Sequence, residues 1–113
     1  MPAPKKSRIV KQPTDLQAGI ASVVEQLAKG EVVSFGDVAA RAGRPEASRA
    51  AGSVLANSAD LPWWRVVYAD GHLPPCNPGL QAERLIEEGV ELRGFRVVRS
   101  PRGRFAKTTS DQS

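Results

Sequence analysis

Apolar residues recur at helical spacing in three segments of the chain, and short β-branched runs separate these segments. The first helix is predicted from Thr14, which begins a capping box, to Gly30, which ends it. Residues 31–34 read EVVS and predict a short strand. Ser34 then caps a second helix, which ends at Gly43 after little more than two turns.

A third helix is predicted over residues 47–57, almost directly after the second. Its apolar positions follow the i, i+3, i+4, i+7, i+8 pattern of one buried helix face. They are Ala47, Ala50, Ala51, Val54 and Leu55. Two helices joined by a glycine-containing turn predict a helix-turn-helix.

The second half of the chain alternates between strand and helix patterns. Residues 64–73 read WRVVYADGHL and predict a β-hairpin with a type I′ turn at Asp70 and Gly71. Residues 80–89 predict a fourth helix, and residues 91–98 a last strand. This order predicts an α+β fold, a single winged helix-turn-helix-like domain.

The charge distribution separates this domain from two basic arms. The chain has 113 residues, a net charge of +4 and a pI near 9.7. Residues 1–13 carry four basic and no acidic side chains, and residues 99–113 carry four basic and one acidic, so residues 14–98 are net negative. We expect the arms to be mobile, and they either contact nucleic acid or only increase solubility.

Several classes of protein are excluded by composition. One cysteine and one histidine rule out an internal disulfide framework and fall short of a structural zinc site, so no metal or cofactor is expected. No apolar run has the roughly 18 residues that a membrane span needs. The sequence predicts a soluble cytoplasmic protein, nucleoid-associated if bacterial.

The outward face of the third helix carries small side chains and one arginine. Its members are Ser48, Arg49, Gly52, Ser53 and Ala56. A helix that reads bases in the major groove projects several long polar side chains, whereas small ones permit close approach to a narrow minor groove. The alternative is packing against another helix of the protein, with Arg49 paired to Glu46 or Asp37.

A family resemblance rests on a long run that includes both tryptophans. The run VVSFGDVAARAGRPEASRAAGSVLANSADLPWWRVVYADG resembles the DNA-binding domain of the O6-alkylguanine-DNA alkyltransferases. In that family Pro-Cys-His-Arg-Val carries the alkyl-accepting cysteine, and this chain reads Pro-Trp-Trp-Arg-Val at residues 62–66. Tryptophan at the cysteine position marks the alkyltransferase-like proteins, which bind alkylated guanine without repairing it.

The residues also argue against catalysis. Alkyl transfer needs a thiolate activated by a neighbouring base. Trp63 has no nucleophilic atom, and Trp64 replaces the histidine that would activate one. Cys76 lies in a proline-rich loop without a histidine beside it. We therefore expect no catalytic residue and no enzyme.

The resemblance implies a role for each residue of the site. Arg49 would enter the duplex and fill the gap of an extruded base, while Ser48, Gly52 and Ser53 approach the DNA. Trp63 would line the pocket for the flipped base; Trp64 would be core, since adjacent residues of an extended segment face opposite sides. Two further residues match positions that support the pocket and the helix end, namely Asn57 and Arg65.

Two positions depart from the family pattern. Phe35 stands where a tyrosine is common, so it keeps the ring but lacks the hydroxyl that would bear on the target phosphate. Cys76 stands where some members place an arginine against the damaged base. Both departures bear on how strongly the pocket separates alkylated from normal guanine.

The resemblance implies a non-enzymatic sensor of DNA damage. It would act as a monomer on double-stranded DNA containing O6-alkylguanine. It would dock its helix-turn-helix in the minor groove, flip the nucleotide and direct the lesion to nucleotide excision repair proteins. Two alternatives are a sequence-specific winged-helix regulator and a residual alkyl transferase that uses Cys76.

Overall fold

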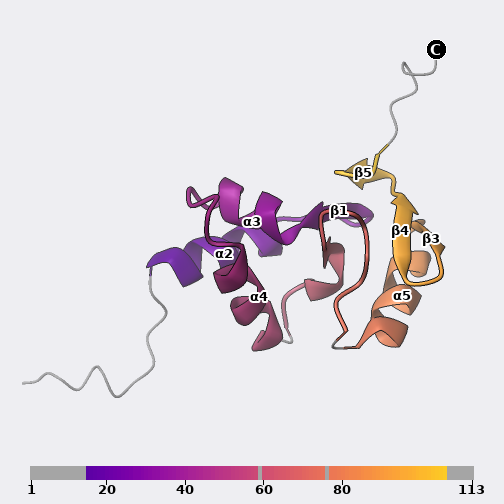
Figure 1. Ribbon diagram of the computed structural model, residues 1–113, viewed down its shortest axis with the longest axis horizontal. Coiled ribbons are helices and arrows are strands. Elements are labelled where there is room, and N and C mark those ends of the chain that lie inside the picture. Colours follow the sequence, from indigo (N-terminus) through magenta and orange to yellow (C-terminus); the bar gives the residue numbers. More distant parts are fainter. Residues whose placement is uncertain (1–14, 59, 76, 107–113) are drawn as a thin grey trace, which may run out of the picture.

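The computed structural model describes residues 15–58, 60–75 and 77–106 and has an α+β fold, as predicted (Figure 1). The predicted helix start at Thr14 lies outside these ranges. The helical elements are α2 (Asp15–Glu25), α3 (Phe35–Arg41), α4 (Ser48–Ala56), the 3-10 turn η2 (Trp63–Arg65) and α5 (Pro78–Glu87). The strands are β1 (Glu31–Ser34), β2 (Val66–Val67), β3 (Glu91–Arg93), β4 (Arg96–Arg99) and β5 (Arg102–Gly103).

Strand β1 lies at the centre of the molecule and serves two hydrophobic clusters. It pairs in parallel with β2 on one side and with β5 on the other. Because neighbouring strand residues point to opposite faces, Val33 packs with α2, α3 and α4, whereas Val32 packs with α5, β3 and β4. The small sheet therefore joins a helical layer to the layer formed by α5 and the β3–β4 hairpin (Figure 1).

The helix-turn-helix consists of α3 and α4. Ser34 caps α3: its hydroxyl accepts from the Asp37 amide at 3.0 Å, and the Asp37 carboxylate accepts from the Ser34 amide at 3.0 Å. Of the predicted apolar stripe on α4, Ala51 and Leu55 are buried and pack on the first cluster. None of the described helices has the length and apolar character needed to cross a membrane.

The predicted hairpin over residues 64–73 is wrong in its pairing and in its turn. Strand β2 pairs with β1 rather than with the residues that follow it. The turn has three residues between Tyr68 and His72, with Gly71 at φ 97°. Among the described residues only glycines have positive φ, so Asp70 does not adopt the type I′ conformation.

The end of the chain also differs from the prediction. Residues 91–98 form an antiparallel hairpin, β3–β4, rather than one strand, because Gly94 at φ 62° turns the chain. The domain does not end at residue 98: β5 pairs with β1, and Phe105 packs on the second cluster. The folded part extends to residue 106. Residues 1–14 and 107–113, which hold most of the predicted arms, lie outside the described residues.

Candidate nucleic-acid interface

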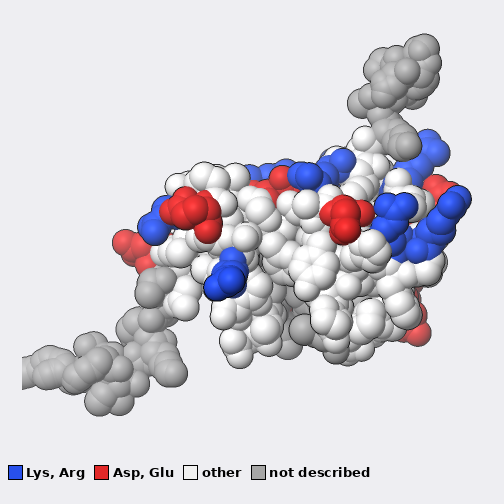
Figure 2. Space-filling view, viewed as in Figure 1, with Lys and Arg blue, Asp and Glu red and all other residues white. Residues whose placement is uncertain are grey.

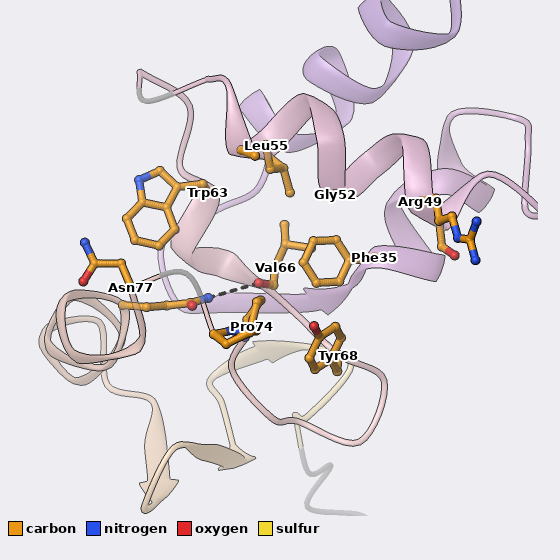
Figure 3. Close-up of a pocket in the computed structure, with 13 residues that line it drawn as sticks. Phe35, Arg49, Gly52, Leu55, Trp63, Val66, Tyr68, Pro74 and Asn77 are labelled. Carbon is orange, nitrogen blue, oxygen red and sulfur yellow. Dashed lines mark hydrogen bonds between the residues drawn. The ribbon is translucent and has the colours of Figure 1, made fainter.

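A cavity of about 680 Å³ opens between α4, the turn at Tyr68 and the start of α5. Its volume is in the range of small-molecule pockets. Five of the predicted site residues line it, namely Phe35, Ser48, Arg49, Gly52 and Trp63. Figure 3 shows Trp63 and Arg49 at opposite ends of the lining, with Phe35 and Val66 between them.

The small-residue face of α4 is open to solvent and does not pack inside the protein. Ser48, Ser53 and Ala56 are exposed, and a Cβ added to Gly52 would meet no atom within 4 Å. Arg49 forms no ion pair among the described residues. Its proposed partners are occupied, since Glu46 pairs with Arg44 and Asp37 pairs with Arg104. The internal-packing alternative is therefore wrong.

The two tryptophans pack on different hydrophobic clusters. Trp63 lines the cavity and packs on the first hydrophobic cluster, and Trp64 packs on the second. Their rings meet edge to face, with centroids 5.9 Å apart at 86°. The expected extended backbone is replaced by a 3-10 turn, whose three residues per turn also direct adjacent side chains apart.

Glu88 fixes the segment that carries both tryptophans. Its carboxylate accepts from Arg65 Nε and Nη2 at 2.9 and 2.7 Å, from Trp64 Nε1 at 2.9 Å and from the Gly30 amide at 2.8 Å. Burial raises the pKa of Glu88, but the hydrogen bonds from Arg65, Gly30 and Trp64 outweigh it and hold that pKa below its ordinary value. Arg65 also donates to the Leu27 carbonyl at 2.8 Å.

Several predicted residues do not line the cavity. Arg65 points to Glu88 on the other side of η2, and Asn57 bonds back to the Ser53 carbonyl at 3.0 Å, at the end of α4. Ser53 is exposed on α4 but also lies outside the lining. Arg65 and Asn57 thus support the elements around the cavity. Cys76 lies outside the described residues.

Sequence reasoning missed the polar groups at the floor and rim. Gln81 is 2% exposed, and its amide donates to the carbonyls of Trp64 and Val66 at 3.1 Å each, the second of which is drawn in Figure 3. Asn77 lies at the rim and is exposed. A helical glutamine among apolar neighbours was the available signal, because buried amides need partners.

Tyr68 was also missed, although it lies two residues beyond the Pro-Trp-Trp-Arg-Val motif. It lines the cavity, is 45% exposed, and its ring lies 5.7 Å from that of Phe35 at 50°. The hydroxyl that Phe35 lacks is therefore present on the neighbouring ring. No cluster of His, Cys, Asp or Glu suited to a metal ion occurs among the described residues.

Comparison with known proteins decides the family. Residues 15–90 match the family model described as the 6-O-methylguanine DNA methyltransferase, DNA binding domain. The chain belongs to this family. Within it, the DNA base-flipping protein of Escherichia coli (strain K12) is 40% identical over 77 residues, which are 64% of this chain. The match spans 60% of the length of that relative.

A further relative has a different name, and a solved structure shares the fold. A bifunctional methyltransferase/endonuclease of Picrophilus torridus is 31% identical over 76% of this chain, but the match covers only 30% of that protein. The crystal structure of S. pombe Atl1 in complex with damaged DNA containing O6-carboxymethylguanine superimposes with a TM-score of 0.64. It is 24% identical, and the match covers 74% of this chain and 83% of that one. This likeness shows a shared fold.

Proposed function

We propose that the protein is a non-enzymatic reader of DNA damage that binds O6-alkylguanine in duplex DNA. The observation that carries the proposal is the cavity itself. It joins the exposed small-residue face of α4 to the Trp63 indole, with Arg49 at one end. A base extruded past α4 would enter this cavity, where Trp63 offers a π-face and apolar contact to the alkyl group.

Each part of the interface has a physical task in this proposal. The small side chains of α4 let its backbone approach the minor groove, and Arg49 fills the gap in the base stack. The Asn77 amide, at the rim, is a donor and acceptor for the edge of the flipped base. The Tyr68 hydroxyl, beside Phe35, is a donor for the phosphate of the rotated nucleotide.

The absence of transfer chemistry follows from the residue at the acceptor position. By the family resemblance Trp63 stands where the alkyl-accepting cysteine would be. An indole lacks the activated thiolate that accepts an alkyl group from guanine. The name of one relative agrees with reading rather than repair, since it is called a DNA base-flipping protein, whereas a second relative is named a bifunctional methyltransferase/endonuclease. The bound complex would then pass to nucleotide excision repair, which rests on the resemblance alone.

The test compares two duplexes that differ only by one O6-methylguanine, at the same salt concentration. Fluorescence anisotropy should give tighter binding to the modified duplex, and mass spectrometry of the protein should show no added methyl group afterwards. Equal affinities would instead leave a general or sequence-specific DNA binder. A stoichiometric mass increase would mean that the protein is a transferase.

A further inference from the structure

A row of basic side chains crosses the outer surface of the β3–β4 hairpin and reaches the turn that carries Tyr68. Arg93 lies directly opposite Arg96 in the hairpin, and Arg96 forms an antiparallel bridge with His72. Residues directly opposite one another in such a ladder point to the same face. All three are exposed, whereas Leu92 and Val97 of the next pair face the second cluster.

Backbone hydrogen bonds hold this row in a fixed place beside the cavity. The Val97 amide donates to the Gly71 carbonyl at 2.8 Å, and the Leu73 amide donates to the Phe95 carbonyl at 2.9 Å. The Tyr68 amide donates to the His72 carbonyl at 3.0 Å, and Tyr68 lines the cavity. The row therefore begins in the same turn as the cavity wall.

The charges of the two arginines are not used inside the protein. Neither Arg93 nor Arg96 has an ion-pair partner in residues 15–58, 60–75 and 77–106, while His72 pairs with Asp70 at 2.9 Å. Two like charges directly opposite in a ladder destabilise it. A bound anion would relieve that repulsion. Figure 2 shows basic side chains gathered over the hairpin and β5, and basic atoms also over α4 on the same face.

Two exposed aromatic rings flank the row. Phe95 is 55% exposed at the tip of the hairpin, between Arg93 and Arg96, and Tyr68 is 45% exposed at the cavity end. Exposed rings beside cations are typical of surfaces that bind nucleic acids. The row crosses three chain segments, a span of about 10 Å, which is long enough to reach neighbouring phosphates of one DNA strand.

We infer that the row of Arg93, Arg96 and His72 is a second DNA contact, which binds the phosphates next to the extruded nucleotide. This inference rests on the proposed function, because it places the bound strand at the cavity. The contact is with the phosphate backbone of the DNA and does not distinguish one base from another. It strengthens binding to damaged and undamaged duplex alike.

The test is the salt dependence of binding for the double variant R93Q/R96Q. Losing two phosphate contacts should make the slope of log affinity against log salt less negative by about 1.8. The affinity at 0.1 M salt should fall at least about tenfold. The preference for the O6-methylguanine duplex should stay as in the wild type. The control K29Q/R41Q also removes two positive charges, from the α2–β1 turn and from the end of α3, where Arg41 pairs with Glu31, and should change the slope by much less.

Other outcomes would overturn the inference while leaving the proposed function intact. If wild-type protein prefers the lesion but R93Q/R96Q binds with unchanged slope and affinity, the row does not contact DNA, and an acidic protein surface is its better partner. A slope change equal to that of the control would mean a general charge effect. Thermal melting checks the fold, and removal of the like-charge pair should leave the Tm unchanged or higher.

Discussion

The ring of Tyr68 lies against the ring of Phe35, with centroids 5.7 Å apart, at the wall of the cavity. One ring comes from the turn after β2, and the other begins α3 directly after its cap. The pair thus joins the helix-turn-helix to the segment beyond the tryptophans. Its only hydroxyl belongs to Tyr68, half exposed and free to meet a nucleotide.

The Tyr68 hydroxyl is expected to contribute to DNA binding and not to folding. Replacement of Tyr68 by Phe keeps the ring contact and removes the donor, so the melting temperature should not change. A lost hydrogen bond to a charged phosphate costs about 1.5 kcal/mol, which is about tenfold in affinity. Fluorescence anisotropy on the modified duplex measures this loss; wild-type affinity in Y68F would exclude the contact.

Gly52 is expected to lower the stability of the fold and to allow α4 to approach DNA closely. It costs about 1 kcal/mol relative to alanine in a helix interior, and a Cβ there meets open space. Gly52→Ala should therefore raise the free energy of unfolding by about 1 kcal/mol. The new methyl group should hinder close approach of α4 to the duplex and weaken binding about tenfold.

Gly79, in the first turn of α5, is the matched control for that substitution. It too has no atom within 4 Å of an added Cβ, but it does not line the cavity. Gly79→Ala should leave the affinity for DNA unchanged. If Gly52→Ala stabilises the protein and binds DNA as tightly as the wild type, the small-residue face of α4 is not a contact surface.

Acid should weaken the fold through Glu88. Its pKa in the folded protein lies below the ordinary value of 4.5, so the ionised carboxylate stabilises the fold. That contribution is complete above pH 4.5 and is lost as the pH falls through the lower, folded-state pKa. Melting temperatures measured from pH 7 to pH 3 should show this decline in the wild type.

The variant Glu88→Gln isolates this carboxylate. It leaves the Arg65 guanidinium, whose side chain is only 14% exposed, without its partner, and should cost about 3 kcal/mol at pH 7. Its melting temperature should then fall less steeply than that of the wild type below pH 4.5. Glu87→Gln, at an exposed position of the same helix, should melt like the wild type throughout. Parallel pH curves for wild type and E88Q would contradict the assignment.

The helical half of the fold was predictable because its signals are local. Ser34 and Asp37 form the capping box that their spacing predicts, and the α4 stripe at Ala51 and Leu55 is buried. Glycines with positive φ follow the second helix and α5 as expected, at Gly43 and Gly89, but α2 ends at Glu25 rather than at the predicted Gly30. These features depend on residues within a few positions of one another.

The strand half was not predictable, because its pairing depends on distant residues. The β-branched side chains of Val66 and Val67 favour a strand but do not specify which strand it pairs with. Their parallel pairing with β1 depends on the packing of β1 between the two hydrophobic clusters. The basic stretch after residue 98 suggested an arm, yet Arg104 bonds both to Asp37, at 3.1 Å, and to the Ala69 carbonyl, at 3.1 Å. Such long-range contacts leave no periodic pattern in the sequence.

The site shows the same division. Arg49, Gly52 and Trp63 were identified from the bare helix face and the motif. Gln81 and Tyr68 line the same cavity but come from α5 and from the turn after β2. Arg65 lies in the motif but faces Glu88, because the 3-10 turn directs it away from the cavity.

In the proposed complex Trp63 lines a pocket for an extruded alkylated base, and Arg49 fills the gap that this base leaves. The most direct measurement is the ratio of affinities for an O6-methylguanine duplex and its guanine twin, at one salt concentration. It would be made for wild type, Arg49→Ala and Trp63→Ala, with Lys29→Ala as the control for lost charge and melting curves as the check of folding. Wild type and Lys29→Ala should clearly prefer the lesion, and both other variants should lose that preference. A folded Trp63→Ala protein that keeps the wild-type preference would show that this indole does not form the pocket for the lesion.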